Sequence, residues 1–213
     1  MRRSGKDAAY SCDTGAMTSL LETMARYEMT ASWAVWPPSV SYERTSDISF
    51  PTNDLDGILH ARSVVLGLNP GAPKVVRRPW HNFHTAGGHN DHFLAEAFRD
   101  TVHWGAYMTD LLSEVNSKSA TLDLSGGTIR RDVAVLVDQL QTLEAADPLF
   151  ILIGTKTAKA FTDHAPVLSD GLGLARVRSV AVPHYSAANG RVHGNSPCKY
   201  RQLVLAALTA ADD

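Results

Sequence analysis

The chain of 213 residues is predicted to fold as a three-layer α/β/α protein with a central sheet of four parallel strands. Short apolar segments rich in β-branched residues alternate with segments whose apolar residues recur every three or four positions. The stretches between the strands are long enough for the right-handed crossover connections that parallel strands require. Strands joined in this way are covered by helices on both faces, which defines the α/β class.

The N-terminal part of the chain is expected to contribute little to this sheet. Residues 1–15 show no periodicity, and we expect a disordered tail there. Apolar residues at helical spacing predict a helix over 18–29, and the aromatic- and proline-rich segment 33–51 is expected to be an extended loop over the domain. No linker divides the rest, so residues 16–213 are expected to form one domain.

Strands and helices alternate over the remainder of the chain. The first strand, 63–68, is a β-branched run that ends in a turn rich in glycine and proline. Helix 128–145 carries an apolar stripe at helical spacing, and a glycine follows strand 149–153. The other expected elements are helix 91–101, strand 106–112, helix 156–163, strand 177–182 and helix 196–211.

Composition bounds the class of protein. A hydrophobic fraction of 44%, a charged fraction of 20% and a net charge of −2 are those of an ordinary globular protein. No apolar run is long enough to span a membrane, and none follows Arg2 and Arg3 as it would in a secretory signal. Cys12 and Cys198 are far apart, which argues against a disulfide framework, structural zinc or an iron–sulfur cluster. We expect a cytoplasmic protein without a metal or cofactor, and a monomer.

Polar residues follow three of the predicted strands. Asn69 comes after the first, Asp110 belongs to the end of the second, and His184, Tyr185 and Ser186 come after the fourth. Because the carboxyl ends of parallel strands meet at one edge of a sheet, these side chains are expected to converge there. The alternative is that Asn-Pro-Gly is merely good turn chemistry. If Asn69 serves catalysis, its replacement by alanine is expected to lower the rate and leave thermal stability nearly unchanged.

Two of these segments carry a family resemblance. The turn Gly-Leu-Asn-Pro-Gly at 67–71 and the later Val-Pro-His-Tyr-Ser at 182–186 resemble the two signature motifs of the uracil-DNA glycosylase superfamily. The first is similar to the Gly-x-Asn-Pro-Gly turn of the mismatch-specific and single-strand-selective branches. In the second, Tyr185 stands where a proline is usual. The resemblance covers roughly residues 60–205 and implies the three-layer fold of that superfamily.

The resemblance also implies roles for individual residues. Asn69 would orient the attacking water, and Phe83 would stack on the flipped base. Asp110 stands where an Asn usually reads the pyrimidine edge, His184 would stabilise negative charge at the base oxygen O2, and Ser186 would hold a phosphate. The remaining residues of the expected base-binding set are Gly67, Leu68, Pro70, Gly71 and Tyr185. The implied activity is that of a monofunctional DNA glycosylase, because the motifs contain no lysine to form a Schiff base.

Two departures from the family pattern bear on the substrate. A carboxylate at Asp110 offers only hydrogen-bond acceptors, so it would repel uracil O4 and favour an exocyclic amine unless burial raised its pKa. Ala187 and Ala188 stand where the family inserts a bulky side chain into the duplex. Single-stranded or mismatched DNA is therefore a plausible partner. A non-catalytic nucleic-acid- or nucleotide-binding protein of the same fold is the alternative.

Short basic groups flank both motifs. A local cluster of cations can bind a polyanion even when the net charge of the chain is negative, although such clusters are often only solvated faces. Arg191 with Lys199 and Arg201 forms the group beside the second motif. The residues expected to contact DNA are Lys74, Arg77, Arg78, Asn189 and Arg191.

Histidines are concentrated between the first strand and the helix that follows it. The spacing of His81, His84, His89 and His92 is compatible with zinc, which would make a metal-dependent hydrolase a third possibility. No cysteine or carboxylate other than Asp91 stands at a diagnostic distance. The interpretation we favour is an exposed or substrate-lining loop.

Overall fold

The structure is a computed structural model, and it describes residues 19–38, 42–71, 78–85, 90–117, 121–122, 124 and 126–212. The expected disordered tail, 1–15, lies outside the described residues.

In the part of the chain that the structure describes, the sheet has five strands, so the α/β class is confirmed but the expected sheet of four parallel strands is wrong. The strand order is β1-β3-β2-β4-β5, and β1 pairs antiparallel with β3, whereas all other pairs are parallel. The additional strand is only two residues long, too short for any periodicity to reveal it. The strands are β1 (Ser32–Trp33), β2 (His60–Gly67), β3 (Ala106–Asp110), β4 (Leu149–Ile153) and β5 (Arg178–Val182).

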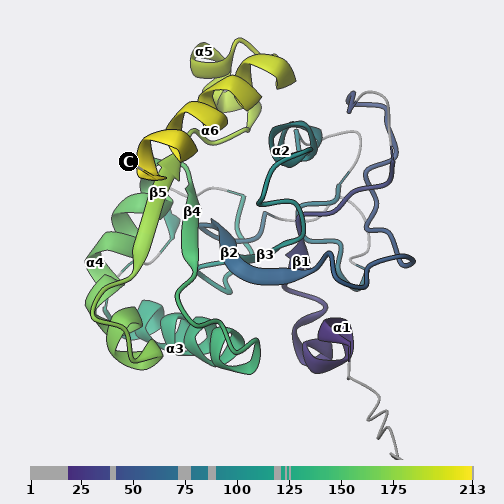
Figure 1. Cartoon of the computed structure of the whole chain (residues 1–213). Coiled ribbons are helices and arrows are strands. Elements are labelled where there is room, and N and C mark those ends of the chain that lie inside the picture. Colours follow the sequence, from purple (N-terminus) through teal and green to yellow (C-terminus); the bar gives the residue numbers. More distant parts are fainter. Residues whose placement is uncertain are drawn as a thin grey trace, which may run out of the picture.

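Helices cover both faces of the sheet, with α3 and α4 on one side and α2 and α6 on the other (Figure 1). Successive side chains of β2 therefore face opposite helix layers. Val64 and Leu66 pack in the cluster with α3 and α4, whereas Val65 packs in the cluster with α2 and α6. All three are fully buried, as expected for a central parallel strand. The helices are α1 (Leu20–Thr23), α2 (His92–Phe98), α3 (Gly126–Thr142), α4 (Thr155–Leu172), α5 (Gly190–His193) and α6 (Pro197–Asp212).

Three helical segments differ from the prediction. The helix expected over 18–29 is reduced to α1, which has a Ser19–Glu22 capping box, and a 3-10 turn at Ala25–Tyr27. The helix expected over 156–163 continues as α4 to Leu172, with Pro166 inside it. Pro166 is exposed, so water can reach the carbonyl group that its missing N–H leaves unpaired. The short α5 was not predicted.

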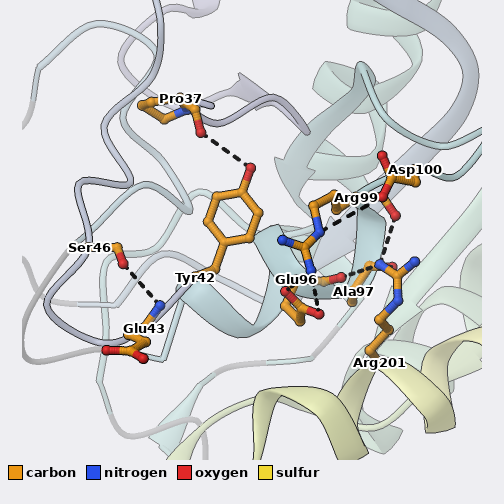
Figure 2. A network of polar contacts seen from close by, with 9 residues as sticks. All are labelled: Pro37, Tyr42, Glu43, Ser46, Glu96, Ala97, Arg99, Asp100 and Arg201. Carbon is orange, nitrogen blue, oxygen red and sulfur yellow. Dashed lines mark hydrogen bonds and ion pairs between the residues drawn. The ribbon is translucent and has the colours of Figure 1, made fainter. Parts of the chain in front are cut away.

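Arg201 on α6 has a structural role that the sequence did not reveal. Its guanidinium donates hydrogen bonds to the backbone carbonyls of Glu96, Ala97 and Arg99 at the C-terminal end of α2 (Figure 2). These carbonyls have no partner within the helix, and a cation there also matches the helix dipole. Arg201, which belongs to the basic group beside the second motif, therefore serves at least to hold the end of α2.

The substitution Arg201→Ala is expected to lower the free energy of unfolding by about 2–3 kcal/mol, because a charged donor to several partly buried carbonyls is lost. Arg201→Lys should recover only part of this loss, since one ammonium cannot reproduce the guanidinium geometry. Urea unfolding of the two variants and the original chain measures the effect. Equal midpoints for Arg201→Ala and the original chain would contradict this assignment.

Candidate functional site

The candidate site lies at the carboxyl edge of the sheet, where the chain changes direction. Strands β2 and β4 are neighbours, but the chain leaves β2 toward α2 on one face and leaves β4 toward α4 on the other. Such a switch point is where open α/β sheets bind ligands. Asn69 follows β2 at this point, and His184 packs against Gly154, which separates β4 from α4.

The first half of the site is built around Gly67. This glycine pairs in register with Asp110 on the neighbouring strand β3. A Cβ on Gly67 would overlap Asp110 Oδ1 and lie 3.1 Å from Phe83 Cζ, so the carboxylate and the aromatic ring both press on the bare backbone. Phe83 is buried and has a φ of +62°, a left-handed conformation that is costly for a bulky residue. Three sequence-predicted residues are thus brought together.

Asn82 belongs to the same cluster, although no motif identified it. Its Nδ2 donates to Asp110 Oδ2 over 2.9 Å and to the backbone carbonyl of Thr30 over 2.9 Å. The amide therefore ties the carboxylate to the segment that precedes β1. An Asn beside a tight turn is too common in sequences to signal such a role.

The second half of the site is built by His184 and Tyr185, whose rings stack with centroids 4.9 Å apart and an interplanar angle of 25°. Burial raises the pKa of Tyr185 well above its usual value, and the charges of Asp91 and Asp110 raise it further. Tyr185 also shares a side-chain hydrogen bond with Asp91, which precedes α2. Tyr185 therefore connects His184 to the Asp110 side of the site.

The proton of His184 has a defined position. The backbone N–H of Ser186 donates to His184 Nδ1 over 3.0 Å, so Nδ1 is the acceptor and the proton of the neutral ring is on Nε2. Burial lowers the pKa of His184, and His193 lowers it further. His184 is therefore a neutral imidazole at pH 7, and its Nε2–H has no acceptor among the residues that the structure describes.

Asn69 is held by its amide nitrogen. Nδ2 donates to the backbone carbonyls of Pro70 at 3.1 Å, Glu114 at 3.1 Å and Asn116 at 2.7 Å. These bonds fasten the loop after β3 to the turn after β2. They also fix the amide plane and leave Oδ1, an acceptor, as the polar atom with which Asn69 can hold a ligand or a water.

The expected phosphate-binding residues divide into two groups. Ser186 Oγ accepts a hydrogen bond from Asn189 Nδ2 over 3.0 Å, so these two side chains form one polar unit before α5. Arg78 and Arg191 are exposed. The predicted contacts Lys74 and Arg77 lie outside the described residues.

The histidine-rich loop does not gather into a cluster where the structure describes it. His84 and His92 are buried, and His81 Nδ1 lies 2.8 Å from the carbonyl of Pro79. His89 lies outside the described residues. Within the described ranges, no group of three His, Cys, Asp or Glu side chains is arranged to hold a metal ion.

His84 is instead a core residue that makes stability depend on pH. Its two ring nitrogens lie 3.0 Å from the carbonyl of Ile48 and 3.1 Å from that of Trp33. These contacts raise the pKa, but burial outweighs them and lowers the pKa of His84 from 6.5 to about 3. The unfolded chain therefore binds a proton below pH 6.5 that the folded chain binds only near pH 3.

We expect His84 to lower the free energy of unfolding by about 2 kcal/mol when the pH falls from 6.5 to 5, at 1.36 kcal/mol per pH unit. This loss of stability is absent well above pH 6.5 and grows as the pH falls toward 3, where the folded chain also takes up the proton. Urea unfolding at a series of pH values should show a shallower slope for His84→Gln than for the original chain. Parallel slopes would mean that His84 is protonated in the fold.

No protein-family model matches the chain, and no curated protein matches it in sequence. Among the described residues, no helix is long and apolar enough to cross a membrane.

Proposed function

We propose that the chain is a monofunctional DNA glycosylase of the uracil-DNA glycosylase type, which hydrolyses the N-glycosidic bond of a flipped deaminated or damaged base. The observation that carries the proposal is the neutral His184, with its proton on Nε2, at the switch point that also holds Asn69. An N–H donor of this kind is what a developing negative charge on a base oxygen requires. The motif resemblance at 67–71 and 182–186 supports the same interpretation.

Base binding would use the first half of the site. A base removed from the stack must be sandwiched and read inside a pocket. Phe83 supplies an aromatic ring fixed against Gly67, and Asp110 supplies a carboxylate beside the edge of that ring. In the proposed complex, the ring would stack on a planar ligand and the carboxylate would accept hydrogen bonds from the edge of that ligand.

Stabilisation of the leaving group would use His184 and the start of α4. His184 Cβ lies 3.1 Å from the position of a Cβ on Gly154, the residue before the first turn of this helix of 18 residues. The N-terminal end of a helix carries partial positive charge, which disfavours the imidazolium form of His184 and favours an anionic ligand. A neutral donor next to this helix end stabilises a base anion without first losing a proton to it.

Water attack would use Asn69. Its Oδ1 accepts a hydrogen bond from the water, whose oxygen attacks C1′ of the sugar. The C1′–N bond breaks, its electron pair stays with the base, and the water's second proton passes to solvent. Asn69 is a weak base, but a dissociative transition state needs only an oriented water.

A cleavage panel tests the proposal. Labelled single- and double-stranded oligonucleotides that carry uracil, 5-hydroxycytosine, hypoxanthine, xanthine or a thymine mismatch are incubated with the protein and then treated with hot alkali. We expect alkali-dependent cleavage of at least one substrate, and its loss in His184→Ala. Absence of cleavage from every substrate at stoichiometric protein would refute the proposed activity.

A second candidate function is favoured by one contact set. The three hydrogen bonds of Asn69 Nδ2 are a sufficient structural reason for an Asn at this turn. With that role alone, the site would bind a nucleotide or nucleic acid without cleaving it. Binding of the same oligonucleotides without base release would identify this function.

A further inference from the structure

We infer that Asn82 is a positioning residue that holds the Asp110 carboxylate toward the bound base, and that the site therefore takes a pyrimidine with an amino group at C4 rather than an oxo group. This inference rests on the proposed function, because it assumes that the ligand of the site is a base. It gives Asn82, which no motif identified, a part in base recognition, and it names the class of base that the site takes.

The first step is the orientation of the carboxylate. Asn82 Nδ2 donates to both Asp110 Oδ2 and the carbonyl of Thr30, so its amide cannot turn its oxygen toward the carboxylate without losing both bonds. An N–H donor also stabilises the ionised form of a carboxyl group. Asp110 is thereby held as an acceptor.

The second step is the location of that acceptor relative to the base. Asp110 Oδ1 and Phe83 Cζ both lie against the same point above Gly67, so the carboxylate borders the ring on which a base would stack. His184 follows β5, on the other side of β2 from Asp110. O2 and the C4 substituent are the two ends of a pyrimidine's pairing edge. With His184 at O2, Asp110 faces the C4 substituent.

The third step is the charge around that position. Asp91 is 5% exposed, and its charge and that of Asp110 both act on the Tyr185 hydroxyl. The surroundings of Asp110, where the C4 end of the base would lie, are therefore negatively charged. An oxo group there would place a lone pair against negative charge, whereas an amino group would donate. Hydrogen-bonding sites reject analogues of the wrong polarity more strongly than apolar pockets do.

The test uses two single-stranded oligonucleotides that differ only at C4 of one base, 5-hydroxycytosine and 5-hydroxyuracil. The rate of base release and the equilibrium affinity are measured for both. We expect the chain to favour the amino member at least tenfold in both measurements. Asp110→Asn should favour the oxo member, and Asn82→Ala should bring the ratio close to one. Asp147→Asn, which removes an exposed carboxylate paired with Arg178, is the control and should keep the original ratio.

The outcomes separate the two proposals. Preference for the oxo member, or a ratio that Asp110→Asn and Asn82→Ala leave unchanged while unfolding temperatures show both variants folded, would overturn the inference and leave the glycosylase proposal standing. Base release from neither oligonucleotide, together with none in the cleavage panel, would refute the glycosylase proposal. The affinity ratio would then still decide the inference for a binding protein.

Discussion

Replacing His184 by alanine is expected to slow base release by a factor on the order of 10²–10³, the usual cost of removing one preorganised donor to a developing anion. The fold should tolerate the change, because His184 is only partly buried and its hydrogen bond to the Ser186 N–H is local. Single-turnover rates with protein in excess over a labelled oligonucleotide measure the chemical step. Thermal unfolding of the same preparations measures the effect on stability.

Two further variants make this result specific. His184→Gln keeps an N–H donor and should recover part of the rate. His164→Ala removes a partly buried histidine that contacts the Ala160 carbonyl on α4, and it should leave the rate unchanged. Equal rates for His184→Ala and the original chain would exclude His184 as the anion-stabilising group.

The substitution Asn69→Ala is expected to lower both stability and rate. Loss of three hydrogen bonds to backbone carbonyls should cost about 2–3 kcal/mol in the free energy of unfolding. Loss of the oriented Oδ1 should lower the rate by roughly 10²-fold. Because of these bonds, we expect a loss of stability in Asn69→Ala, whereas the sequence alone led us to expect a nearly unchanged thermal stability. Asn69→Asp should be worse for stability, because a carboxylate oxygen would face the three carbonyls that Nδ2 now joins.

A matched variant separates the two effects of Asn69. Ser113 belongs to the same loop and donates from Oγ to Asp132 on α3 over 2.8 Å. Ser113→Ala should therefore lower the unfolding temperature with little change in rate. A comparable rate loss in Ser113→Ala would show that Asn69 acts only by holding the loop.

The parts of the fold that sequence patterns predicted are those in which burial dictates residue type. Strand β4 is predicted and observed at 149–153, because a strand covered on both faces must be apolar throughout. Strand β1 could not be predicted, because its pairing with β3 depends on contacts such as the one between Trp33 and Tyr107, whose ring centroids are 5.1 Å apart. The continuation of α4 through Pro166 could not be predicted, because proline normally ends a helix and only tertiary packing overrides that tendency.

The candidate site was predictable only where residues follow strands. Topology alone brings Asn69, Asp110 and His184 to one edge, so their order along the chain was enough to place them. Asn82 and Asp91 lie in irregular segments, and their contacts with Asp110 and Tyr185 depend on loop geometry that has no periodic signal. The roles of basic residues could not be predicted either. A cation that caps a helix, as Arg201 does, looks the same in the sequence as one that binds phosphate.

The measurement that tests the glycosylase proposal most directly is mass spectrometry of an oligonucleotide before and after one turnover with excess protein. The proposal predicts two products from a substrate carrying a single deaminated or damaged base, namely the free base and an otherwise intact strand with one abasic site. Recovery of only the unaltered oligonucleotide, a base changed in place, or a broken backbone without free base would contradict it.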